Sequence, residues 1–125
     1  MLAAPPTCAT VPPALIKSTL GLSVPKPKAT QGAALVCTYG TVIVRFQTGE
    51  SKAAFTAARK QFDAHGEPTK TYGGLGVQAY SSVIGSGTYA NSTVVALKGS
   101  TEVLVTAQTT VAKVAALVKK VLALL

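Results

Sequence analysis

The sequence predicts an α+β domain in which the helices pack on one face of an antiparallel sheet. Apolar residues recur at helical spacing in some segments, and β-branched residues gather in short runs in others. Glycine-containing turns separate neighbouring strand-like runs, which is typical of hairpins and therefore of antiparallel pairing. The expected order of elements is α-β-β-α-β-β-β-β-α, and a chain of 125 residues with 48% hydrophobic residues fits one domain.

The first helix follows a short leader. We expect residues 1–9 to form a flexible leader and residues 10–125 to form the single α+β domain. Thr10 can cap a helix over Val11–Leu20, because the prolines near its start fall in the first turn, where no amide donor is needed. Gly21 is suited to the position just after the C-terminus of that helix.

A proline-containing loop leads into the first strands. Residues 22–32 show no period, and their prolines favour an extended chain, so a loop is expected there. The runs Ala33–Tyr39 and Thr41–Thr48 are rich in β-branched residues and are joined through Gly40, which predicts two strands.

A central helix is expected over Lys52–His65, with Ser51 as its N-cap. Phe55, Ala58 and Phe62 form one apolar stripe, and charged residues cover much of the remaining surface. The stripe predicts that this helix packs on the sheet.

The second half of the chain is predicted to be mostly strands. They are expected over Thr69–Tyr72, Val77–Ile84, Asn91–Lys98 and Thr101–Gln108, and a last helix over Val111–Leu124. We expect the helices over Lys52–His65 and Val111–Leu124 to share one core, to which they contribute Phe55, Phe62, Val114 and Val118.

The two cysteines, Cys8 and Cys37, predict a disulfide bond. A bond between them would close a loop of about thirty residues and tie the leader to a central strand. Two buried thiols in a reducing compartment are the alternative, whereas redox catalysis usually needs the C-x-x-C spacing, which the chain lacks.

The net charge of +8 comes from twelve basic residues, of which ten are lysines, set against four carboxylates. Nucleic-acid readers favour arginine and stacking aromatics, and neither is concentrated here, so a nucleic-acid partner is not expected. A solubilising lysine surface and a specific anion site both remain open, and a diffuse contact with anionic lipid or cell-wall polymer is compatible with either. No stretch reaches the roughly 20 apolar residues of a membrane span.

The chain is poor in catalytic and metal-binding residues. His65 is its one histidine, and with Asp63 and Glu67 it makes a weak ligand set, so neither a metal nor a cofactor is expected. The segment beginning Gly74-Leu75-Gly76 matches a loose dinucleotide-binding pattern, but it precedes a strand instead of opening a helix, which excludes that interpretation.

These absences favour a non-enzymatic domain that binds a small molecule, a glycan or a protein. Tyr72, Tyr80 and Tyr89 are the candidate ligand-binding residues, because tyrosine combines an apolar ring with a polar tip; packing in the core or at a sheet edge is the alternative for each. A small enzyme with a site near His65 is the alternative function.

Several short motifs together resemble a known class of proteins. Cys8 precedes the first helix, Cys37-Thr38-Tyr39 lies on a predicted strand, and a Gly-Leu-Gly-x-x-Ala-Tyr motif runs from Gly74 to Tyr80. This pattern resembles small secreted proteins and lipoproteins of actinobacteria that form domains of unknown function. The resemblance implies an extracellular or cell-envelope location and no general activity. No signal peptide pattern opens the sequence, so we expect a mature form whose export signal is absent from it.

Overall fold

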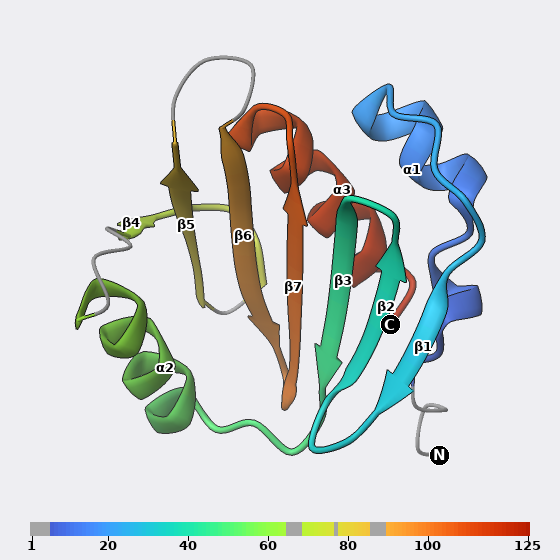
Figure 1. The fold of residues 1–125 in the computed structure, drawn as a ribbon. Helices are drawn as coiled ribbons and strands as arrows, with labels where there is room; N and C mark the ends of the chain where they lie inside the picture. Colours follow the sequence, from blue (N-terminus) through green and yellow to red (C-terminus); the bar gives the residue numbers. More distant parts are fainter. Residues whose placement is uncertain (1–5, 65–68, 77, 86–89) are drawn as a thin grey trace.

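The computed structural model describes residues 6–64, 69–76, 78–85 and 90–125. Its seven strands form one antiparallel sheet in the order β1-β2-β3-β7-β6-β5-β4 (Figure 1). The strands are β1 (Lys28–Gln31), β2 (Leu35–Tyr39), β3 (Val42–Gln47), β4 (Thr69–Thr71), β5 (Gln78–Ile84), β6 (Asn91–Lys98) and β7 (Thr101–Ala107). The helices are α1 (Pro13–Leu20), α2 (Lys52–Ala64) and α3 (Val111–Ala123), with a 3-10 turn, η1, over Cys8–Thr10. The predicted α+β class with an antiparallel sheet is confirmed.

The main core lies between the sheet and the helices α1 and α3, and Figure 1 shows α3 behind the strands. Alternate residues of the central strands, such as Val44 on β3 and Val105 on β7, point into it and pair across the sheet. The inner face of α3 contributes Val114, Val118 and their neighbours, all buried. Thr110 caps α3 by accepting a hydrogen bond from the Lys113 amide at 3.3 Å.

A second, smaller core lies on the opposite face of the sheet, under α2. Phe55 and Phe62 of α2 pack there on Tyr80, Val95 and residues of the neighbouring strands. The prediction that all helices cover one face is therefore wrong for α2, and Phe55 and Phe62 do not share a core with the α3 residues. The sequence of β6 agrees with cover on both faces of the sheet. Its four consecutive apolar residues over 94–97 are all buried, which requires that each face of this central strand is covered.

The N-terminal third departs from expectation in two places. The first helix begins at Pro13, not at Val11, because a residue that precedes a proline is disfavoured in the helical region; Pro12 accordingly has an extended ψ of 153°. The expected loop over residues 22–32 contains β1, an edge strand that pairs with β2. All residues of β1 are exposed, so the strand has no buried face. Its sequence therefore lacks the alternation of apolar and polar residues by which a strand is recognised.

The predicted disulfide is confirmed, since Cys8 and Cys37 are bonded with an S–S distance of 2.04 Å. The bond fixes η1 against β2, on the face that carries α1 and α3. The Tyr39 hydroxyl supports the same contact by donating to the carbonyl oxygens of Val11 at 2.6 Å and Cys8 at 3.2 Å. Burial raises the pKa of Tyr39 to about 12.

The longest helices that the structure describes, α2 and α3, have 13 residues each. Neither approaches the roughly 20 residues that a membrane-spanning helix needs, and no described helix qualifies as a span.

Candidate functional site

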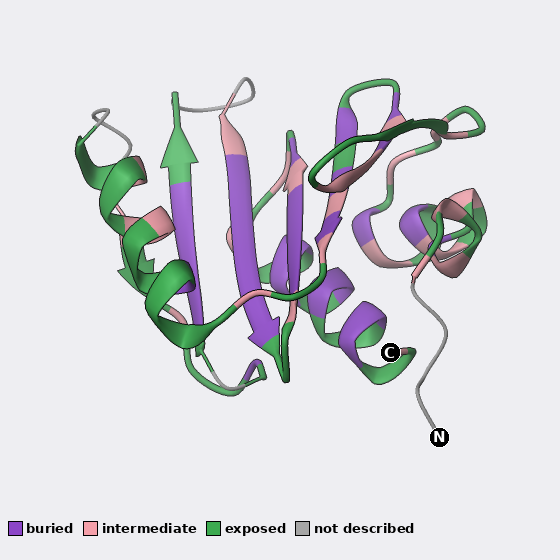
Figure 2. Cartoon of the chain, turned by 90° about the horizontal axis from the view of Figure 1, so that it is seen from below, coloured by how far each residue is buried: buried purple, intermediate pink, exposed green. Residues whose placement is uncertain are grey.

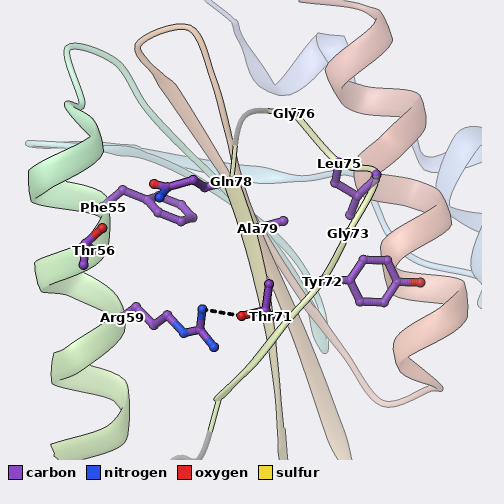
Figure 3. Close-up of a pocket in the computed structure, with 11 residues that line it drawn as sticks. Phe55, Thr56, Arg59, Thr71, Tyr72, Gly73, Leu75, Gly76, Gln78 and Ala79 are labelled. Atoms are coloured by element: carbon purple, nitrogen blue, oxygen red, sulfur yellow. Dashed lines mark hydrogen bonds between the residues drawn. The ribbon is translucent and has the colours of Figure 1, made fainter.

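A hollow of about 400 Å³ lies between α2 and the β4–β5 hairpin. We call it the α2 groove and define it by the residues in Figure 3, of which Phe55, Thr56 and Arg59 come from α2. The other wall is made by residues 71–76, which include three glycines, together with Gln78 and Ala79. The groove therefore has a cationic side at Arg59 and a wall of exposed backbone, with the buried ring of Phe55 beneath it.

Arg59 is held in place by the hairpin that it faces. Its Nε donates to the Thr69 hydroxyl oxygen at 2.8 Å, and its Nη1 donates to the Thr71 hydroxyl oxygen at 2.9 Å. The guanidinium carbon also lies 5.5 Å from the centre of the Tyr80 ring, within the range of a cation–π contact. The side chain thus meets a ligand in a fixed position instead of losing conformational freedom on binding.

The charge of Arg59 is not neutralised by direct pairing with a described carboxylate. Asp63 accepts hydrogen bonds from the backbone amide of Thr69 at 2.9 Å and from its hydroxyl at 3.1 Å, so it reaches Arg59 only through Thr69. Within the described ranges, the one ion pair joins Arg45 to Glu102 at 2.6 Å, on β3 and β7. A planar guanidinium has five N–H groups, and the two threonines take two of them.

Glycines shape the wall opposite α2. Gly74 and Gly76 both have positive φ values, +81° and +56°, which glycine adopts without strain. A Cβ on Gly76 would also lie inside contact distance of the Leu97 carbonyl oxygen, so only glycine fits against β6 there. At Gly73 and Gly74 an added Cβ would meet nothing, which leaves their backbone open to the groove.

The two candidate tyrosines that the structure describes, Tyr72 and Tyr80, do not form one site. Tyr72 lines the groove, but Figure 3 shows its side chain pointing away from Arg59 and toward α3, where it packs on the main core. Tyr80 is 1% exposed and lies between Phe55 and Phe62, with ring centroids 5.2 Å and 5.6 Å away. Tyr80 is thus part of the core beneath the groove, the alternative that the sequence left open. Tyr89 lies outside the described residues, as do His65 and Glu67.

The residue that sequence reasoning missed is Arg59, one of the charged residues of α2. Phe55, Arg59 and Phe62 are spaced at i, i+4 and i+7, so they lie on the same side of a helix. That spacing was available in the sequence and indicates an arginine that faces inward beside two aromatic rings. The Phe–x–x–x–Arg–x–x–Phe pattern is the signal that could have found it.

A second polar cluster lies on the same face of the sheet as α2. Glu102 is 1% exposed and pairs with Arg45, and Glu50 approaches Glu102 from the link before α2. Burial and the nearby charge of Glu102 raise the pKa of Glu50. The same two causes raise the pKa of Tyr80, whose hydroxyl has no hydrogen-bond partner among the described residues. No group of side chains in the described ranges is suited to hold a metal ion.

A further hollow of about 530 Å³ lies on the other side of β4, toward the start of α3. Tyr72 lines it together with Lys70, Val83 and Val111. Its walls include the exposed Val83, and its cation, Lys70, is exposed and makes no hydrogen bond to another described side chain. The α2 groove is smaller than this hollow. Of the two cations that line them, Arg59 and Lys70, only Arg59 is held in position by hydrogen bonds to other described side chains. We therefore take the α2 groove as the candidate site.

Comparisons of the chain with family models, with curated proteins and with solved structures find no match. The resemblance to exported actinobacterial domains therefore stays a prediction.

Proposed function

We propose that this chain is a non-enzymatic binding domain that holds a small ligand with an anionic group in the α2 groove. A volume of about 400 Å³ is suited to a small molecule, since ligand pockets commonly span about 300 to 1,000 Å³. The sequence left a small molecule, a glycan and a protein as possible ligands, and the size of the groove favours the first.

The observation that carries the proposal is the fixed position of Arg59. A guanidinium presents its N–H groups in a planar fork that matches the two oxygens of a carboxylate or phosphate. Thr69 and Thr71 accept hydrogen bonds from Nε and Nη1 of this guanidinium, and the glycine-containing segment forms the other wall of the groove. A ligand with a carboxylate or phosphate would place the charge at Arg59 and the rest of the molecule along the open backbone of Gly73 and Gly74.

We also propose that the domain acts in an extracellular or cell-envelope location, as a member of the exported class that its motifs resemble. The Cys8–Cys37 bond supports this location, because structural disulfides persist in oxidising compartments and are rare in the cytosol. The alternative of a small enzyme depends on His65, and no observation on the described residues favours it.

A thermal-shift screen with the purified domain tests the proposal. The screen compares the melting temperatures produced by small carboxylates and phosphates with those produced by neutral analogues of the same shape. It is run on the wild type, on Arg59→Gln and on Lys60→Gln. The second variant removes the same charge from an exposed neighbour on α2. At a ligand concentration of about 100 times the dissociation constant, binding stabilises by about 2.7 kcal/mol, or roughly 10 °C for a chain of this length.

We expect some anionic compounds to raise the melting temperature of the wild type and of Lys60→Gln, but not that of Arg59→Gln. Equal effects of neutral and anionic compounds, or equal losses in both variants, would contradict the assignment of the anion to Arg59.

A further inference from the structure

The described charges are distributed unevenly between the two sides of the sheet. The helices α1 and α3 carry Lys17, Lys113, Lys119 and Lys120 and no acidic residue, a net charge of +4. The described carboxylates, Glu50, Asp63 and Glu102, belong to α2, its preceding link and the strand face beneath it. The layer made by α1 and α3 therefore carries uncompensated positive charge.

The outer surface of this layer contains only small residues between its lysines. At 100° per residue, the exposed residues of α3 fall in a sector of about 120°. They are Ala112, Lys113, Ala116, Lys119, Lys120 and Ala123. Figure 2 shows the same division, with the inner side of α3 buried and its outer side exposed. On α1, Lys17 lies between the exposed Ala14 and Ser18. We call this surface the lysine face.

The lysines of this face are spread over a wide area. The 13 residues of α3 span about 20 Å, with Lys113 near one end and Lys120 near the other. The Lys120 ammonium donates to the Thr19 hydroxyl at 3.1 Å, which links α3 to α1 and leaves its charge unpaired by any described carboxylate. Lys98 is not part of the face, because its ammonium caps α3 through the Leu122 carbonyl oxygen at 2.7 Å.

We propose that the lysine face lies against an anionic lipid bilayer. A bilayer offers a flat array of mobile headgroups, which can match widely spaced ammonium groups without a shaped pocket. Within the two helices only alanine and serine separate the lysines, and the one bulky exposed side chain beside them, Leu124 just after α3, is apolar and can enter a bilayer. A nucleic acid would favour arginine and exposed aromatic rings, and the described residues of α1 and α3 contain neither.

This orientation is compatible with ligand binding on the other side of the sheet. The α2 groove is bounded by α2, which packs on the opposite face from α3. A domain that rests on its lysine face would hold α2 away from the bilayer. The proposal does not depend on the groove being a ligand site.

Co-sedimentation with vesicles tests the proposal at low salt, with vesicles of phosphatidylcholine alone and of phosphatidylcholine mixed with phosphatidylglycerol. One variant carries Lys113→Gln, Lys119→Gln and Lys120→Gln. The control carries Lys28→Gln, Lys52→Gln and Lys60→Gln, which are exposed lysines outside the lysine face and change the net charge equally. Thermal melts of both variants confirm that they are folded.

We expect the wild type to bind only the vesicles that contain phosphatidylglycerol, and binding to weaken as salt is raised. Each lysine removed from the face should lower partitioning on the order of fivefold, so the first variant should lose on the order of 100-fold. The control should bind nearly as well as the wild type. The proposal is overturned if the wild type does not distinguish the vesicles, if both variants lose equally, or if the wild type binds only a soluble polyphosphate.

Discussion

Reduction of the Cys8–Cys37 bond should destabilise the domain by several kcal/mol. The two cysteines are 29 residues apart in sequence, and the bond closes the loop between them. In the chain-entropy model, releasing a loop of about 30 residues favours the unfolded state by about 3.6 kcal/mol at 25 °C. For a chain of 125 residues the unfolding entropy is about 0.26 kcal/mol/K, so the melting temperature should fall by roughly 14 °C.

The assay is urea denaturation of the wild type with and without a reductant, because reduction removes the bond and leaves both side chains in place. The fold should persist after reduction, since the Tyr39 hydroxyl still holds η1 through the carbonyl oxygens of Val11 and Cys8. Tyr39→Phe should therefore make the protein more sensitive to reduction than the wild type is. A loss below about 1 kcal/mol on reduction would refute the idea that this bond ties the N-terminal segment to the sheet.

Two other outcomes follow from single side chains. Gly76→Ala should cost more stability than Gly74→Ala. Both substitutions place alanine at a positive φ, which costs about 1–2 kcal/mol, but only the Cβ at position 76 collides with the Leu97 carbonyl oxygen. Equal urea midpoints for the two variants would contradict this. Stability should also fall at high pH, because the folded state keeps the Tyr39 proton up to a pKa of about 12, whereas the unfolded state releases it near 10. The contribution of the protonated Tyr39 to the free energy of unfolding is fully present below pH 10 and falls by up to about 2.7 kcal/mol as pH rises to 12. Tyr39→Phe should flatten this dependence of stability on pH, and an unchanged dependence would count against the buried hydroxyl.

The sequence predicted most elements because their signals are local. The strand expected over Asn91–Lys98 is found with those bounds, since turn residues stand on both sides of a β-branched run. β1 could not be predicted in the same way, because its four exposed residues are ordered by pairing with β2 and not by a buried face of their own. Local pattern thus identified the strands that build the core and missed the one that only extends the sheet.

The position of α2 shows a different kind of error. The stripe of Phe55 and Phe62 correctly predicted that α2 packs on the sheet, but a stripe does not say which face of a sheet a helix covers. The continuous apolar runs of β6 and β7 carried that information, since a strand covered on one face alternates and a strand covered on both does not.

The candidate site was the least predictable part. The α2 groove is formed by a helix and a hairpin that contribute residues from 55 to 79, and its key contacts join Arg59 to Thr69 and Thr71. No local pattern fixes how a helix and a hairpin face each other. The predicted tyrosines were chosen for their chemistry alone, and the structure places Tyr80 in the core and turns Tyr72 toward α3.

The most direct test of the central claim is a map of backbone and arginine side-chain chemical shifts by NMR during titration with an anionic compound that stabilises the domain. We predict that the largest changes fall on the amides of Gly73, Gly74 and Gly76 and on the side-chain N–H groups of Arg59, which line the same groove. The same titration of Arg59→Gln should produce no saturable change at these glycines. Changes centred instead on the lysine face, or on the hollow beside Lys70 and Val83, would contradict the α2 groove as the ligand site.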